Sequence, residues 1–237
     1  MASLFIDGEW VGSGDGTCSP VVNPSDGSVV TEVDVATDDQ VQAAIAAARR
    51  AFDETDWPRT PAIERAALLD RVADLLERDL EELARKETLN TGKAMRESRI
   101  DIADVVRVFR YYADLAIEEA SRPVDTGSPT ALSRIVYEPV GVCGLIGPWN
   151  YPLLQLSWKI APALAAGCTA VMKPARLTPL TTIHLTRLLD EAGVPRGVVN
   201  LVLGEGERVG QALADSPLVD LISLTGGIEA GRALLRG

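Results

Sequence analysis

Asn150 has a setting suited to chemistry, because the turn Gly147-Pro148-Trp149-Asn150-Tyr151-Pro152 surrounds it with two prolines and a glycine. Such a rigid turn fixes the direction of the amide. A fixed amide N–H donor that faces a cleft can stabilise a developing oxyanion. An ordinary asparagine turn is the alternative explanation of the same residues.

Three further turns carry residues suited to nucleotide binding. In the first, Lys173-Pro174-Ala175-Arg176, a lysine held by the following proline can reach the hydroxyls or phosphate of a nucleotide, although a surface lysine fits equally. The second, Gly204 to Gly210, has the glycine spacing GxGxxxG, which differs from the dinucleotide fingerprint GxGxxG. The third, Thr225-Gly226-Gly227, opens a helix in which Gly231 follows, and free backbone N–H groups there can bind a pyrophosphate.

The elements that position these turns alternate from residue 140 onwards. Short apolar segments at 141–147, 169–173, 198–204 and 218–224 are separated by helical patterns. Continuously apolar strands between helices indicate a parallel sheet that is covered on both faces. We therefore predict a doubly wound α/β domain, in which ligands bind at the carboxyl ends of the strands. Gly167 and Gly193 are predicted to end helices in the left-handed conformation.

The N-terminal half is predicted to be mainly helical, after short strands and turns in the first residues. One helix starts after Thr37, with Gln40 completing a capping box. A second is capped by Thr60, has Pro61 at its first position, and keeps its apolar face through Leu83. A third spans 94–120. Residues 122–130 are predicted to be a connection, and 132–141 to contain a strand.

Composition excludes several classes of function. The net charge of −11 argues against nucleic-acid binding, which requires clustered basic residues. No apolar run reaches the length of a membrane span. The three cysteines, far apart and odd in number, are predicted to be reduced thiols of a cytoplasmic protein, with Cys143 and Cys168 buried and inert. His184 is the only histidine and has no partner at a useful spacing, so no metal site is predicted.

The four turns together, PWNYP, KPA, GEGxxVG and LTGG, resemble those of the aldehyde dehydrogenase superfamily, and the resemblance covers essentially the whole chain. The turn NPSDG at 23–27 and the segment ETLNTGK at 87–93 are also similar to that family. WNYPLLQLSWKIAPALAAGC and SLTGGIEAG most resemble its betaine-aldehyde dehydrogenases.

The resemblance implies oxidation of an aldehyde to a carboxylic acid with NAD or NADP. It implies that Asn150 donates to the oxyanion and that Lys159 belongs to a charge relay. The positions implied to bind the cofactor are Ile146, Pro148, Trp149, Lys173, Ala175, Arg176, Gly206, Gly210, Thr225, Gly226, Gly227 and Gly231.

Two positions depart from the commonest family pattern. Arg176 stands where many NAD-using members have a glutamate that accepts from the ribose 2′-hydroxyl. An arginine favours a 2′-phosphate instead, so we hypothesise that NADP is tolerated or preferred. Gly227 replaces a common serine, as it often does in the betaine-aldehyde group.

Tyr151 and Trp158 are the candidate substrate-binding residues. They are seven residues apart and therefore lie on one face of a helix. Two aromatic faces can form half of a cage for a trimethylammonium group through cation–π attraction. Plain aromatic packing along a substrate tunnel is the alternative.

The resemblance also implies how the chain is divided into structural parts. Residues 1–122 would form the N-terminal helical part of the cofactor domain, 123–139 a connection and a strand of the oligomerisation type, and 140–237 a Rossmann-like part that is incomplete at its C-terminus. The catalytic domain, with the family's nucleophilic cysteine and general-base glutamate, is expected beyond Gly237. These 237 residues alone are therefore expected to be inactive, and the full-length enzyme to be a homo-oligomer. A non-catalytic dinucleotide-binding or subunit-association module is the competing hypothesis.

Overall fold

The computed structural model describes residues 2–118, 121–127, 130 and 132–236. Its centre is a six-stranded sheet in the order β10-β7-β8-β9-β1-β2. Four of these strands run parallel: β7 (Val142–Ile146), β8 (Thr169–Lys173), β9 (Val199–Leu201) and β10 (Leu221–Leu224). Every residue of β7, β8 and β9 is buried. The predicted doubly wound α/β fold is confirmed.

An N-terminal hairpin extends this sheet and makes it mixed. β1 (Leu4–Ile6) and β2 (Glu9–Val11) pair antiparallel, and β1 also pairs antiparallel with β9 through Phe5 and Leu201. The Asn200 side-chain carbonyl accepts from the backbone N–H of Asp7 at 2.9 Å. The sequence predicted short strands here but not their place in the main sheet. Local patterning carries no information about a partner almost two hundred residues away.

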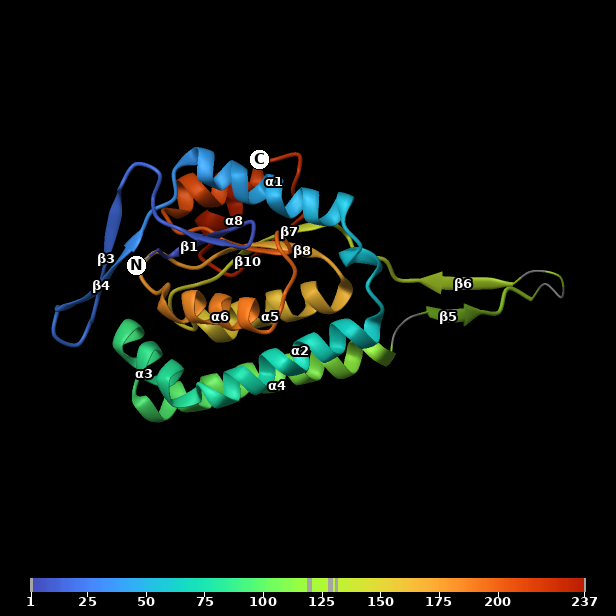
Figure 1. The fold of residues 1–237 in the computed structure, drawn as a ribbon, viewed down its shortest axis with the longest axis horizontal. Coiled ribbons are helices and arrows are strands. Elements are labelled where there is room, and N and C mark those ends of the chain that lie inside the picture. The colour runs from blue at the N-terminus through green and yellow to red at the C-terminus, as the bar shows by residue number, and fades with distance from the viewer. Residues whose placement is uncertain (1, 119–120, 128–129, 131, 237) are drawn as a thin grey trace.

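Helices cover both faces of the sheet (Figure 1). On one side lie α1 (Asp38–Glu54), the π-helical turn η2 (Gly206–Gly210), α7 (Gln211–Ala214) and α8 (Ile228–Leu234). On the other side lie α5 (Pro152–Ala166) and α6 (Leu180–Glu191), which pack on the strands. A further layer beyond α5 and α6 contains α2 (Ala62–Arg78), α3 (Leu80–Thr91) and α4 (Met95–Glu118). Burial of these apolar faces is the main source of stability.

Several helix ends follow the predicted residue types. Thr37 and Gln40 form the reciprocal capping box of α1. Gly167 and Gly193 follow α5 and α6 with φ of 85° and 88°, in the left-handed region that L side chains rarely adopt. In both respects the sequence prediction is confirmed.

The predicted second helix is wrong in two respects. It begins at Ala62, after the short helix η1 (Trp57–Arg59), and the Thr60 hydroxyl donates to the Asp56 carbonyl instead of capping it. It also ends at Arg78, because Asp79 leaves the helical conformation with φ −96° and ψ 11°. The apolar spacing continues through this break, so the periodicity could not locate it.

Two hairpins lie outside the main sheet. β3 (Cys18–Val22) pairs with β4 (Val29–Asp34), and β5 (Ser121–Val124) pairs with β6 (Ser133–Val136). The second hairpin projects from the body of the molecule (Figure 1). The predicted connection at 122–130 is thus partly wrong, since 121–124 form a strand. The last two residues of the predicted helix 94–120 lie outside the described residues, as do 128–129 and 131.

Candidate functional site

A cleft lies at the edge of the sheet where β7, β8 and β10 end. It has two compartments, of about 620 Å³ and about 500 Å³, which share Ile146, Glu205, Gly206, Leu224 and Ala230 and are therefore continuous. Most of the positions predicted to bind cofactor or oxyanion line the larger one: Ile146, Pro148, Trp149, Asn150, Lys173, Ala175, Arg176, Gly206, Thr225, Gly226 and Gly227. Gly210 lines the smaller one.

The strand register explains why residues so far apart in sequence meet here. Ile146 is level with Lys173 on one side and with Leu224 on the other. Backbone hydrogen bonds continue past the strands, from Gly147 N to Lys173 O at 3.0 Å and from Thr225 N to Ile146 O at 3.1 Å. Parallel strands bring their carboxyl ends to one edge, so the turns that follow them converge.

The Asn150 turn lines the larger compartment of the cleft. Trp149 and Asn150 are both exposed, and the Trp149 carbonyl accepts from the Thr178 hydroxyl at 3.0 Å. Within the described part of the chain, the Asn150 side chain makes no hydrogen bond, so its N–H donors are available to a ligand. Such an amide can bind an oxygen that gains negative charge during a reaction.

Lys173 is a buried cation at the floor of the cleft. Its side chain is buried, and its ammonium group donates to the Pro174 carbonyl at 3.1 Å. Burial lowers the pKa of Lys173 to about 8, and the negative charge of Glu205 opposes this effect. The ammonium form still predominates at pH 7 and can bind a hydroxyl or a phosphate oxygen.

Arg176 is paired with a carboxylate that the sequence analysis did not single out. Its Nε donates to Glu205 Oε1 at 2.8 Å, and its Nη1 lies 3.4 Å from Ser19 Oγ. Both charged side chains are substantially exposed and both line the cleft. Glu205 lies between Gly204 and Gly206, and the sequence analysis marked this turn by its glycines and its family resemblance without assigning a role to the carboxylate.

The glycines leave space on the cleft side. A Cβ added at Gly206 or Gly227 would meet no atom within 4 Å, whereas one at Gly210 would contact Ile146 at 3.7 Å. Gly231 lies further along α8 and lines neither compartment, so its role in cofactor binding stays a prediction.

Lys159, Tyr151 and Trp158 lie outside the two compartments. The Lys159 ammonium donates to Ser223 Oγ on β10 at 3.1 Å, and burial lowers its pKa. Tyr151 and Trp158 are about half exposed. The ammonium of Lys93 lies 3.9 Å from the centroid of the Tyr151 ring, so one face of that ring already has a cation from the chain itself.

The cysteines are free thiols, and none of the three lines the two compartments. Cys143 and Cys168 are buried, as predicted, and Cys18 is exposed on β3. The residues lining the cleft therefore combine an amide donor, a buried ammonium and a guanidinium–carboxylate pair, but no thiol nucleophile.

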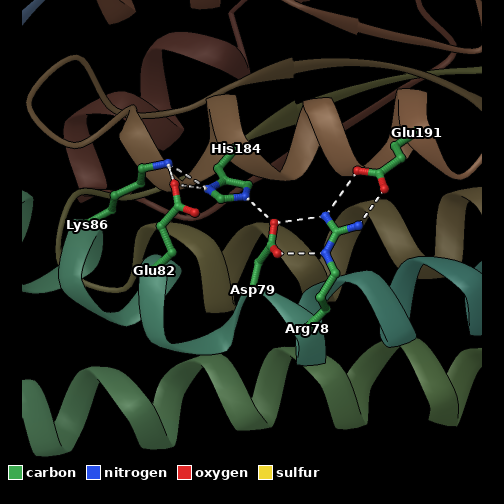
Figure 2. A network of polar contacts seen from close by, with 6 residues as sticks. All are labelled: Arg78, Asp79, Glu82, Lys86, His184 and Glu191. Carbon is green, nitrogen blue, oxygen red and sulfur yellow. Dashed lines mark hydrogen bonds and ion pairs between the residues drawn. The ribbon is translucent and has the colours of Figure 1, made fainter.

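His184 does have partners, in contrast to the sequence prediction. Its Nε2 lies 2.8 Å from Asp79 Oδ2 and its Nδ1 lies 2.8 Å from the Lys86 ammonium, as Figure 2 shows. A neutral imidazole that donates to Asp79 and accepts from Lys86 satisfies both contacts, and burial lowers the pKa of His184 accordingly. Asp79 lies between α2 and α3 and Lys86 lies within α3, each about a hundred residues earlier, and local spacing cannot indicate them.

The same network contains the only grouping of potential metal ligands in the described residues. Ligand atoms of Asp79, Glu82 and His184 lie within 4.8 Å of one another. Lys86 already occupies the Nδ1 side of the imidazole and also pairs with Glu82 at 2.6 Å. Arg78 binds both Asp79 and Glu191 (Figure 2), so these charges are balanced by basic side chains.

Comparison with known proteins gives consistent matches. The aldehyde dehydrogenase family model matches residues 10–237. Betaine aldehyde dehydrogenase of Bacillus subtilis (strain 168) is 50% identical over 234 residues, which are 99% of this chain and 48% of that protein. Human retinal dehydrogenase 2 is 44% identical over 98% of this chain and 45% of its own length.

A solved structure matches in three dimensions. The crystal structure of Staphylococcus aureus betaine aldehyde dehydrogenase in complex with NAD+ superposes with a TM-score of 0.96 at 45% identity, and the match covers 100% of this chain and 47% of that one. The chain belongs to the aldehyde dehydrogenase family. It spans about half the length of the relatives it matches.

Proposed function

We propose that this chain forms the cofactor-binding part of an enzyme that oxidises an aldehyde to a carboxylic acid with NAD or NADP. The observation that carries the proposal is the convergence of Asn150, Lys173 and the Thr225–Gly227 turn on one continuous cleft. Family membership and relatives that bind NAD+ support it.

In this proposal each part of the cleft has a chemical task. The Asn150 amide donates to the oxyanion that forms when a nucleophile attacks the aldehyde carbonyl. Lys173 and the Arg176–Glu205 pair bind the adenosine ribose. The glycines at 206, 226 and 227 let the cofactor approach the backbone, while Gly210 and Gly231 belong to the same region. Lys159 takes part in proton transfer from a position half-buried against Ser223.

The nicotinamide cofactor, when bound, would accept the hydride that the aldehyde loses. Ile146, Pro148, Trp149 and Ala175 line the space that it would occupy. Arg176 provides a positive charge for a 2′-phosphate, but Glu205 neutralises part of that charge. We infer that both cofactors bind and that Glu205 limits the preference for NADP.

The aldehyde is proposed to be betaine aldehyde or a related compound. Similarity to a betaine aldehyde dehydrogenase supports this choice. Tyr151 and Trp158 would contribute aromatic faces, and the Lys93 ammonium already lies over one face of the Tyr151 ring. A full-length enzyme that turns over simple aliphatic aldehydes equally well would contradict the cage.

We further propose that the complete protein is a cytoplasmic homo-oligomer. Val136, the last residue of the projecting β5–β6 hairpin, and Tyr137, which follows it, are each about 60% exposed. Exposed apolar groups on a two-stranded ribbon favour pairing with another copy. Three unpaired thiols are consistent with a reducing compartment. Among the described residues, no helix combines the length and the apolar character that a membrane span requires.

Calorimetric titration of the 237-residue chain with NAD tests the proposal. We expect binding, and we expect Gly227→Val to abolish it while the thermal midpoint stays unchanged. The added side chain would meet no protein atom near its Cβ and would project into the space for the cofactor. If Gly227→Val bound NAD as well as the wild type, this assignment of the cleft would be contradicted. It would also be contradicted if the variant lost binding only because it no longer folds.

Activity and size separate the two candidate roles. We expect no aldehyde-dependent NADH production from these residues alone, because no cysteine in the described part lines the cleft. An antibody to this segment should detect a polypeptide about twice as long in the native host, since relatives have that length. A native polypeptide of 237 residues that binds NAD would favour the non-catalytic module.

A further inference from the structure

Lys93 is held between two acidic side chains and one aromatic ring. It follows Gly92 at the end of α3, and only 15% of its side chain is exposed. Its ammonium forms an ion pair with Asp101 of α4 and lies 3.7 Å from Glu87 Oε1. The same ammonium lies 3.9 Å from the centre of the Tyr151 ring. The cation is thus fixed on one side by carboxylates and presented to the ring on the other.

Tyr151 is the residue directly after Asn150 and precedes the first residue of α5. The Tyr151 ring and the Asn150 amide are therefore side chains of adjacent residues in one turn. The turn has one further side-chain anchor in the described residues, the hydrogen bond from Thr178 to the Trp149 carbonyl. Asn150 itself makes no side-chain hydrogen bond in the described residues, and these two contacts hold the residues on either side of it, Trp149 and Tyr151.

The same α3 segment also holds the residues that support Thr178. The Asn90 amide donates to the Leu177 carbonyl at 2.8 Å, and its carbonyl accepts from Leu180 N at 3.1 Å. The segment 87–93 therefore contacts Tyr151 through Lys93 and, through Asn90, the residues Leu177 and Leu180 on either side of Thr178 in the chain.

We propose that Lys93 is a positioning residue for the turn Pro148–Tyr151. Its ammonium, fixed by Asp101, holds the Tyr151 ring by cation–π attraction and thereby sets the direction of the Asn150 amide. The use of that amide in catalysis rests on the proposed function, but the coupling of Lys93 to Asn150 does not. A purely structural ion pair between the end of α3 and α4 is the competing explanation.

Nuclear magnetic resonance of the 237-residue chain tests the coupling, because the chain has only four lysines and four asparagines. With labelled lysine, we expect the ε-methylene protons of Lys93 to resonate upfield of the other three through the ring current of Tyr151. Tyr151→Leu should abolish this displacement. With labelled asparagine, Lys93→Met should shift the Asn150 side-chain amide signals, and Lys93→Arg, which keeps the cation, should restore them.

Lys86→Met is the matched control. Lys86 lies within α3, and its loss removes the ion pair with Glu82 and the contact with His184 without touching Tyr151. We expect the Asn150 side-chain amide signals of Lys86→Met to coincide with those of the wild type. Lys93→Met with a lower unfolding midpoint but unmoved Asn150 signals would show a structural ion pair only and overturn the proposal.

The positioning role of Lys93 can be tested even if Lys93→Met does not fold, and it can be tested separately from the proposed function. If Lys93→Met does not fold, Tyr151→Leu still tests the coupling, since unmoved Lys93 and Asn150 signals in that variant would refute it. NAD titration of the same wild-type sample tests the cofactor role separately. A chain that fails to bind NAD but shows the Lys93-dependent shift would lose the proposed function and keep the positioning role.

Discussion

Replacement of Glu87 by glutamine should change how stability depends on pH. Glu87 is fully buried on α3, where its Oε2 accepts from the Thr181 hydroxyl at 2.9 Å. Burial raises its pKa from the ordinary 4.5 to about 7, although Thr181 and Lys93 oppose this effect and Asp101 adds to it. Its Oε1 has no hydrogen-bond partner among the described residues.

The raised pKa gives the sign of the effect. Between about pH 4.5 and 7 the folded chain keeps a proton on Glu87 that the unfolded chain has lost. The contribution of this group to folding stability is therefore complete below 4.5 and is lost as the pH rises through 7. The difference between the two pKa values corresponds to about 3 kcal/mol in the free energy of unfolding, at roughly 1.4 kcal/mol per pH unit.

Urea unfolding of wild type and Glu87→Gln between pH 4.5 and 8 measures this contribution. Glutamine can still accept from Thr181 but cannot ionise, so the variant should gain about 3 kcal/mol relative to the wild type across the range. Groups common to both proteins cancel in the difference. Glu97→Gln, the same change at an exposed position of α4, is the matched control. A stability difference between Glu87→Gln and wild type that stays constant over this pH range would refute the reasoning.

Two further predictions concern the Arg176–Glu205 pair and Gly92. Glu205→Gln should raise the affinity for 2′,5′-ADP relative to 5′-AMP about two- to five-fold, the range for an exposed ion pair, and Arg176→Glu should lower it. Calorimetry measures both ratios, and unchanged ratios would contradict the ribose placement. Gly92→Ala should destabilise the fold by about 1–3 kcal/mol, since φ is 79° and the new Cβ would lie 2.8 Å from Pro24 Cγ. Gly16→Ala, with similar φ and open space, should cost less in urea unfolding; equal losses would exclude the Pro24 contact as a cause.

Much of the fold was predictable because its signals are local. Continuous apolar strands between helical patterns indicated the parallel sheet, and the residue types at Thr37, Gly167 and Gly193 correctly marked helix ends. The convergence of the turns after the strands on one cleft was predictable, because strands of a parallel sheet end at one edge. The break at Asp79 was not, since the apolar spacing passes through it.

Contacts between distant segments were beyond local reasoning. The pairing of Glu205 with Arg176, of Asp79 with His184 and of Lys93 with Tyr151 joins residues that lie 29 to 105 positions apart. A charged residue in a sequence has many possible partners, and only the packing of the helices selects one.

The sequence by itself determined the class of fold, the family and the positions that line the cleft, because these depend on residue type and on order along the chain. The tertiary structure decided the pKa shifts of Glu87 and Lys173, the partner of Arg176 and the position of the Lys93 ammonium over the Tyr151 ring. Burial and electrostatic interaction depend on distances in space, which are set only when the helices and the sheet pack together.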